Sequence, residues 1–199
     1  MNIKIIPVSQ LNDKQISHLA RLHHAVLHSL LSELGLPIVE KYYQVACTDT
    51  LVVGVCAVGQ DGSLLGWGIG SSKPNQVNGR MREAWGWLIF QMIRVLVTRP
   101  RLILQLVASA RSASIELKED AIELTYLGVD TAARNQGLGR ELLDAFVQSA
   151  RQRGYRSVVL SVEAENKDAI ALYTGAGFAI VYSFKEGRFH RYRMELIFQ

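Results

Sequence analysis

The chain has 199 residues, the length of one domain, and can bury a full hydrophobic core. Hydrophobic residues make up 49% and charged residues 20%, a globular composition that excludes a disordered chain. The formal net charge of +4 suits an anionic cofactor, but Lys and Arg form no basic run, so we expect no nucleic-acid partner.

The N-terminus, the cysteines and the longest apolar stretch bear on location. The opening MNIKIIP turns polar too early for a secretory signal peptide. Cys47 and Cys56 have neither a disulfide framework nor metal-ligand spacing, and we interpret them as buried thiols. Residues 85–97 are apolar but fall short of the about 20 residues that a membrane span needs. We therefore expect a soluble, cytoplasmic protein.

The first 70 residues predict a strand, two helices and a hairpin. Asn12 is a typical helix N-cap, Gly35 a typical helix end, and Pro37 suits the first turn of the next helix. A Gln60-Asp61-Gly62 turn predicts the hairpin. In chain order we expect a strand at 3–8, helices at 12–31 and 38–47, and strands at 51–58 and 63–69.

A polar loop at 71–78 leads into an apolar helical insertion at about 80–112. Pro100 divides it into helices at 81–97 and 102–112. Arginines are spaced around it: Arg80, Arg82, Arg94, Arg99, Arg101 and Arg111. We expect the insertion to pack as a helix pair. A lid over a binding site, a contact between the subunits of a homodimer, and a basic amphipathic helix on a membrane surface stay open as alternatives.

The second half of the chain alternates strands with helices. We expect strands at 121–129, 156–162, 178–184 and 190–197, and helices at 137–153 and 166–174. The alternation implies parallel strand pairing, whereas the hairpins imply antiparallel pairing. The predicted fold is a single α/β domain over 1–199, with a central mixed β-sheet, helices on both faces and the helical insertion.

The segment Arg134-Asn-Gln-Gly-Leu-Gly139 lies between a predicted strand and a predicted helix. Its helix N-terminus presents N–H groups without intrahelical partners, and its glycines let a diphosphate approach the backbone. Gly-Lys-Ser/Thr is absent, and Leu142 stands where a dinucleotide fingerprint has its third Gly or Ala, so neither a P-loop nor that fingerprint fits. The pattern predicts an anion site; the alternative is a tight strand-to-helix turn.

Three segments in this order, ELTYLGVD (123–130), RNQGLGRELL (134–143) and NKDAIALY (166–173) followed by Gly177-Phe178, resemble the GCN5-related N-acetyltransferase (GNAT) superfamily. The resemblance is specific from 121 to 184, looser over the first 70 residues and weak over 71–118. It implies a GNAT-like mixed α/β fold. It also implies that acetyl is transferred from acetyl-CoA to a primary amine, by direct attack, on a small-molecule or peptide acceptor.

The resemblance also implies residue roles. The 134–139 loop would bind the CoA pyrophosphate, the strand end would pair with the pantetheine arm, and an N–H near Val129 would polarise the thioester carbonyl. Asn166 matches a position contacting the pantetheine or phosphate region, and Thr174-Gly175-Ala176 departs from the charged residues that relatives usually carry there. The residues implied in cofactor binding are Leu127, Gly128, Val129, Arg134, Asn135, Gln136, Gly137, Leu138, Gly139, Arg140 and Asn166.

Two side chains are candidates for proton transfer. A lysine-like amine with a pKa of about 10.4 is neutral in roughly one molecule in a few thousand at pH 7, so a base is useful. Glu123 is our candidate, because simple alternation puts it on the same edge as Leu127 and Val129; a glutamate on a partly solvated face is the alternative. Tyr173 matches the tyrosine near the CoA sulfur and would protonate the thiolate; the alternative is a core aromatic.

The histidines and the function class complete the expectations. His18, His23, His24 and His28 lie on the first predicted helix, but no third ligand accompanies the His24–His28 pair, so we expect no metal. The acetyltransferase is our main interpretation. A non-catalytic acyl-CoA-binding or regulatory module on the same fold is the alternative.

Overall fold

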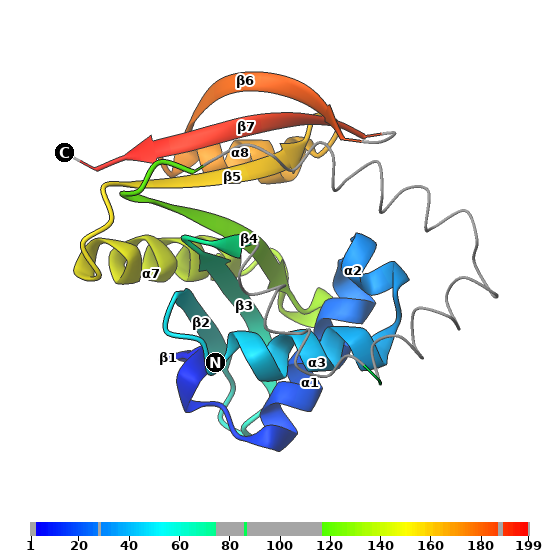
Figure 1. Ribbon diagram of the computed structural model, residues 1–199. Helices are drawn as coiled ribbons and strands as arrows, with labels where there is room; N and C mark the ends of the chain where they lie inside the picture. Colours follow the sequence, from blue (N-terminus) through cyan, green and yellow to red (C-terminus); the bar gives the residue numbers. More distant parts are fainter. Residues whose placement is uncertain (1–2, 28, 75–85, 87–116, 187–188, 199) are drawn as a thin grey trace.

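The computed structural model describes residues 3–27, 29–74, 86, 117–186 and 189–198 (Figure 1). The predicted helices at 81–97 and 102–112, and His28, lie outside these residues, apart from residue 86. The strands are β1 (Lys4–Pro7), β2 (Val52–Val58), β3 (Leu64–Ser71), β4 (Ala121–Val129), β5 (Ser157–Glu163), β6 (Ala179–Glu186) and β7 (Phe189–Ile197). The α-helices are α1 (Asp13–Val26), α2 (Leu30–Glu33), α3 (Leu36–Ala46), α7 (Leu138–Gln152) and α8 (Lys167–Gly175).

The seven strands form one mixed sheet in the order β1-β2-β3-β4-β5-β7-β6. The pairing of β4 with β5 is parallel, and the other five pairings among the described strands are antiparallel. The predicted mixed α/β sheet is thereby confirmed. Parallel pairing in the second half is limited to this one pair, because β7 lies between β5 and β6 and runs antiparallel to both.

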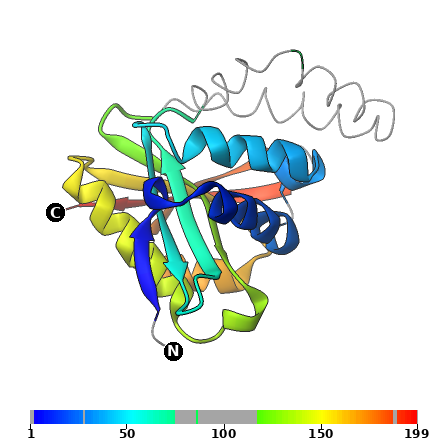
Figure 2. The same cartoon turned by 90° about the horizontal axis from the view of Figure 1, so that it is seen from below.

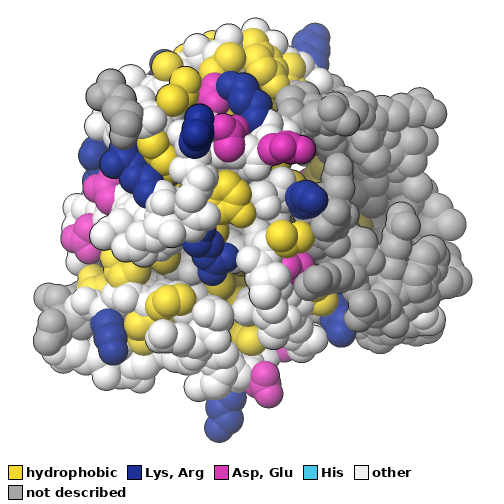
Figure 3. All heavy atoms as spheres, turned by 60° about the vertical axis from the view of Figure 1, so that its left-hand side comes forward, with side chains coloured by type: hydrophobic (Ala, Val, Ile, Leu, Met, Phe, Trp, Pro, Cys, Tyr) yellow, Lys and Arg dark blue, Asp and Glu magenta, His cyan; other side chains and the backbone are white. Residues whose placement is uncertain are grey.

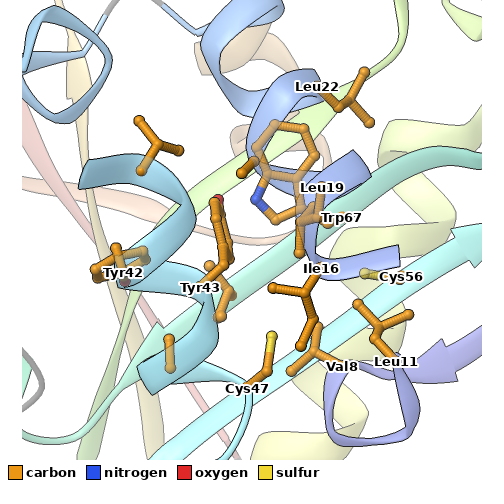
Figure 4. Close-up of a cluster of buried hydrophobic side chains, with 14 of the residues drawn as sticks. Val8, Leu11, Ile16, Leu19, Leu22, Tyr42, Tyr43, Cys47, Cys56 and Trp67 are labelled. Carbon is orange, nitrogen blue, oxygen red and sulfur yellow. The ribbon is translucent and has the colours of Figure 1, made fainter. Parts of the chain in front are cut away.

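Helices cover both faces of the sheet. On one face α1 and α3 pack side by side (Figure 2) and enclose a core with Trp67, Tyr43 and Leu19 at its centre (Figure 4). On the other face α7 packs against β2, β3 and β4. Residues of α8 pack against the same apolar core, which contains Phe146 and Leu160. Both layers follow from the four-residue and two-residue apolar spacings of these segments.

The predicted helix at 12–31 is wrong at its C-terminal end. Asn12 forms the expected N-cap, in a capping box with Gln15, but α1 ends at Val26, and Leu27 is extended. The Ser29 side chain then accepts a hydrogen bond from the Ser32 backbone N–H, which starts the separate helix α2. The serine cap competes with helix continuation, and it breaks an apolar pattern that looked continuous.

β4 carries a bulge and leaves its neighbour early. On the β3 side, Ile69 pairs with Tyr126 and Gly70 with Leu124, so Thr125 is an extra residue. On the β5 side, pairing runs from Ala121 to Leu124 and stops. Beyond this point β4 and β5 run apart (Figure 1). We call this divergence after Leu124 the fork.

Cys47 and Cys56 are buried and free, as predicted. Burial raises the pKa of Cys47 to about 12 and also raises the pKa of Cys56. Both thiols therefore keep their protons at neutral pH and are poor nucleophiles. Among the described helices, none is long and apolar enough to cross a membrane.

Candidate active site

The fork leaves one edge of β4 without a strand partner. The β4–β5 register ends at Leu124, so the backbone of residues 125–129 faces the opening with unpaired hydrogen-bonding groups on that side. An extended ligand can pair with such an edge as an added strand would. Three of the predicted cofactor-binding residues, Leu127, Gly128 and Val129, lie here. The side chains of Leu127 and Val129 pack toward α7.

Gly128 is a glycine for a reason that the sequence does not reveal. Gly128 is buried, and a Cβ atom on it would lie 2.5 Å from the fully buried ring of Trp67. The packing of Trp67 over β4 therefore explains this glycine without a ligand. The Gly128 backbone still lies on the β4 edge that borders the fork.

Residues 134–139, which we call the anion loop, follow β4 and lead into α7. Asn135 and Gly137 have φ angles of 61° and 81°, in the left-handed region. Residues 134–137 are exposed, and no side chain caps the N-terminus of the 15-residue helix α7. A Cβ atom on Gly139 would make only ordinary contacts, at 3.8 Å, with Leu172 and Val129. The loop thus exposes backbone N–H groups at the positive end of a helix, as anion binding requires.

The polar side chains of the region divide into free and occupied groups. Arg134 donates from Nε to the Val129 carbonyl at 3.2 Å and is otherwise exposed. Arg140 donates from Nε to both carboxylate oxygens of Asp144 at 2.9 Å and from Nη1 to the Gly175 carbonyl at 2.9 Å, so it joins α7 to the end of α8. Asn166 caps α8 by accepting from the Ala169 N–H at 3.1 Å. Arg140 and Asn166 thus have structural roles that no ligand is needed to explain.

Tyr173 lies on α8, which adjoins the start of α7. No residue of α8 is fully buried, and Tyr173 is partly exposed, with its ring 5.9 Å from that of Phe178. The partial exposure argues against a purely structural core aromatic. Burial of part of the side chain raises the pKa of Tyr173 to about 12. The phenol therefore stays protonated throughout the physiological range and is available as a donor.

Glu123 does not lie where simple alternation put it, and that prediction is wrong. The bulge at Thr125 shifts the pleat by one residue, so Leu124 and Leu127 both face α7. Tyr126 faces α1 and α3. Glu123 directly precedes Leu124 in the strand, so its side chain points away from α7 and lies on the same side as Tyr126. The carboxylate of Glu123 forms an ion pair with Arg193 of β7. Glu123 is thus on the opposite face from Leu127 and Val129, and it is already partnered.

Charged residues of β5, β6 and β7 that the sequence analysis did not select line this face. Arg193 Nη1 donates to Ser161 Oγ at 2.9 Å, and Arg191 pairs with Glu186 at 2.7 Å and with Glu163 at 4.0 Å. The sequence of β7 contains a signal for its charged residues. In the segment HRYRMEL the charged residues recur with period two, which places Arg191, Arg193 and Glu195 on one face of β7.

A buried histidine lies on the same side of the sheet. His23 contacts Tyr43 Oη through Nδ1 at 2.7 Å and Ser29 Oγ through Nε2 at 3.0 Å. Burial, and secondarily the charge of His24, lowers the pKa of His23 to about 4, so the ring is neutral at pH 7. His23 is therefore a hydrogen-bonded core residue. Within the described residues, no group of three or more His, Cys, Asp or Glu could hold a metal ion.

One face of the molecule carries charged side chains of both signs. On the face shown in Figure 3, Lys and Arg side chains are interspersed with Asp and Glu side chains. No continuous basic surface appears on this face, in contrast to the footprint that nucleic-acid binding leaves.

Comparison with known proteins assigns the fold to a family. Residues 28–178 match the Acetyltransferase (GNAT) family. A mycothiol acetyltransferase of Jonesia denitrificans is 49% identical over 59 residues, which cover 30% of this chain and 19% of that protein. The chain thus aligns with about a fifth of the length of this curated relative.

Solved structures share the fold at low identity. The ribosomal-protein-S18-alanine N-acetyltransferase of Escherichia coli has a TM-score of 0.60 at 18% identity, covering 99% of this chain and 94% of that one. The structure of yncA from Salmonella typhimurium with its cofactor acetyl-CoA has a TM-score of 0.58 at 16% identity, covering 100% and 95%. These structures show the same fold, and the family match over residues 28–178 shows that the chain belongs to the GNAT acetyltransferase family.

Proposed function

We propose that the protein transfers the acetyl group of acetyl-CoA to a primary amine of a small-molecule or peptide acceptor. The observation that carries this proposal is that the fork opens beside the anion loop. An unpaired strand edge at 125–129 leads directly into exposed N–H groups at the start of α7. An extended arm that ends in a diphosphate matches this sequence of groups, and acetyl-CoA has both parts.

In this proposal the cofactor lies along β4. The backbone N–H groups of the anion loop hold the pyrophosphate, and Arg134, exposed beside them, adds positive charge. The pantetheine arm pairs with the β4 edge, and an N–H near Val129 polarises the thioester carbonyl. We assign Arg140 a supporting role, because Asp144 already neutralises much of its charge.

Tyr173 assists departure of the CoA thiolate. The thiol has a pKa near 8.5 by analogy with cysteine. The pKa of Tyr173 is about 12. Full proton transfer from Tyr173 to the thiolate would thus be uphill by about 3.5 pK units, or roughly 5 kcal/mol. We therefore propose that Tyr173 stabilises the thiolate chiefly by donating a hydrogen bond to it.

Glu123 is proposed to receive the proton of the attacking amine, directly or through water. Arg193 keeps one carboxylate oxygen occupied. No described residue donates a hydrogen bond to the other oxygen of Glu123. That oxygen can bind an ammonium group and accept its proton.

The proposal is tested by thiol release from acetyl-CoA with a panel of small amines and peptide N-termini, alongside acetyl-CoA binding by calorimetry. We expect turnover with at least one amine and detection of the acetylated product by mass spectrometry. Binding of acetyl-CoA without turnover across the panel would contradict the proposal and favour a non-catalytic acyl-CoA-binding or regulatory module. The cytoplasmic location and the homodimer stay predictions from the sequence.

A further inference from the structure

Arg193 reaches across one strand to connect two others. It lies on β7 opposite Ser161 of β5, and its Nη1 donates to Ser161 Oγ at 2.9 Å. The same nitrogen forms the ion pair with Glu123 on β4. Its side chain is 7% exposed, against 24% for Glu123. A buried arginine thus links β4 to β7 over the top of β5.

The ion pair between Arg193 and Glu123 lies at the fork. Glu123 pairs in register with Val159 of β5, and Leu124 forms the last β4–β5 pair. The ion pair therefore lies one residue before the strands diverge. A buried guanidinium has a strong requirement for a charged partner, so it holds the Glu123 carboxylate in place. Nη1 of the planar guanidinium contacts both Glu123 and Ser161, whereas a lysine would offer a compact charge on a flexible stem.

We propose that Arg193 is a positioning residue for acyl transfer: it fixes the Glu123 carboxylate at the fork so that the second oxygen, which accepts from no described residue, meets the acceptor amine. This inference rests on the function proposed above. Because Glu123 faces Tyr126 and the α1 and α3 side, away from Leu127 and Val129, Arg193 acts on the amine and not on the binding of acetyl-CoA.

The test compares Arg193→Met, Arg193→Lys, Glu123→Gln and the double variant Arg193→Met/Glu123→Gln. The control is Glu195→Gln. Glu195 lies on the same strand as Arg193, and the substitution removes its ion pair with Lys118 without touching Glu123. For each protein we would measure kcat and KM for the amine, the Kd for acetyl-CoA, and Tm.

We expect Arg193→Met to lower kcat/KM for the amine by about ten-fold or more, since a positioned base typically contributes at least that much. The Kd for acetyl-CoA should stay within about two-fold, because the anion loop is untouched. Arg193→Lys should recover part of the rate. The double variant should be no slower than Glu123→Gln, since both changes remove one function. Glu195→Gln should retain the wild-type rate.

Several outcomes would overturn the inference. Additive losses in the double variant, a parallel loss of acetyl-CoA affinity, or no rescue by lysine would each identify Arg193 as a structural strut. If Arg193→Met does not fold, the double variant, which leaves no unpaired buried charge, and Arg193→Lys still decide the question. Absence of turnover in the wild type would instead overturn the proposed function, and it would be seen before any variant is compared.

Discussion

The face of the sheet that bears α1 and α3 changes character along the strand order. Over β2, β3 and β4 it is an apolar core, in which Trp67 and Tyr43 are fully buried. Over β5 and β7 the same face carries Ser161, Arg191 and Arg193, held by ion pairs and hydrogen bonds. The boundary between the two regions is the fork.

This contrast separates stability from chemistry. The first region buries apolar area, which stabilises the fold in a non-directional way. The second region holds charged groups in fixed positions, which contributes little net stability but defines where a substrate charge can lie. If this division is correct, changes in the first region should alter unfolding with little effect on catalysis. Changes at the fork should do the reverse.

The largest expected effect is the pH dependence of stability due to His23. Its pKa is about 4 in the folded protein, below the ordinary value of 6.5. Between these values the unfolded chain binds a proton that the folded protein does not, so stability falls as the pH drops through this window. The shift of about 2.5 pK units corresponds to at most about 3.4 kcal/mol of unfolding free energy, present in full above pH 6.5.

Urea unfolding of wild type and His23→Asn at several pH values from 7 to 4 measures this effect. The wild type should lose more stability on acidification than the variant. The control is His24→Gln, which changes an exposed neighbour on the same helix and should leave most of the slope in place. Parallel curves for wild type and His23→Asn would show that His23 is not the group responsible.

Next in size is Tyr173→Phe, which tests the chemistry beside the anion loop. Loss of the phenol O–H removes a hydrogen bond to the departing thiolate, and we expect kcat to fall about 100-fold. The Kd for acetyl-CoA should change little, since the ring and its contact with Phe178 remain. Steady-state thiol release and calorimetry measure the two quantities. An unchanged kcat would reject a role for Tyr173 in thiolate departure.

The sequence predicted local elements well and contacts between distant strands poorly. It predicted β4 with the bounds Ala121–Val129 and placed α7 within one residue at each end, because both depend on local apolar periodicity and glycine positions. The bulge at Thr125 escaped it, because simple alternation was extended through ELTYLGV although the apolar residues Tyr126 and Leu127 are adjacent. The predicted face for the Glu123 side chain was wrong for that reason.

The partner of Glu123 was beyond local reasoning for another reason. Arg193 lies 70 residues away in the chain, and β7 reaches the site only because it inserts between β5 and β6. Such a strand order depends on tertiary pairing and leaves no local signal. The end of α1 failed differently, since the cap at Ser29 competes with an apolar pattern that continues to Leu31.

Two glycines of the predicted cofactor set offer the sharpest test of the division between stability and chemistry. A Cβ atom on Gly128 would lie 2.5 Å from the buried Trp67 ring, whereas one on Gly139 would make contacts at 3.8 Å. Gly128→Ala should therefore lower the unfolding free energy by about 2 kcal/mol through overpacking. Gly139→Ala, inside the first turn of α7, should leave stability equal or slightly higher, because alanine favours a helix by about 0.5–1 kcal/mol.

The affinity for acetyl-CoA should change in the opposite order, with the larger loss in Gly139→Ala. The added methyl group at 139 lies at the start of α7, where the diphosphate is proposed to approach the backbone, so acetyl-CoA should bind Gly139→Ala at least about ten-fold more weakly. Gly128→Ala should bind it nearly normally at temperatures where the variant is folded, since its added atom points toward Trp67 and α1. Urea unfolding and calorimetry on the two variants separate these effects. Equal losses of acetyl-CoA affinity in the two variants would contradict the division between stability and chemistry. They would show that the core on the Trp67 side of β4 and the cofactor-binding edge of β4 act as one unit.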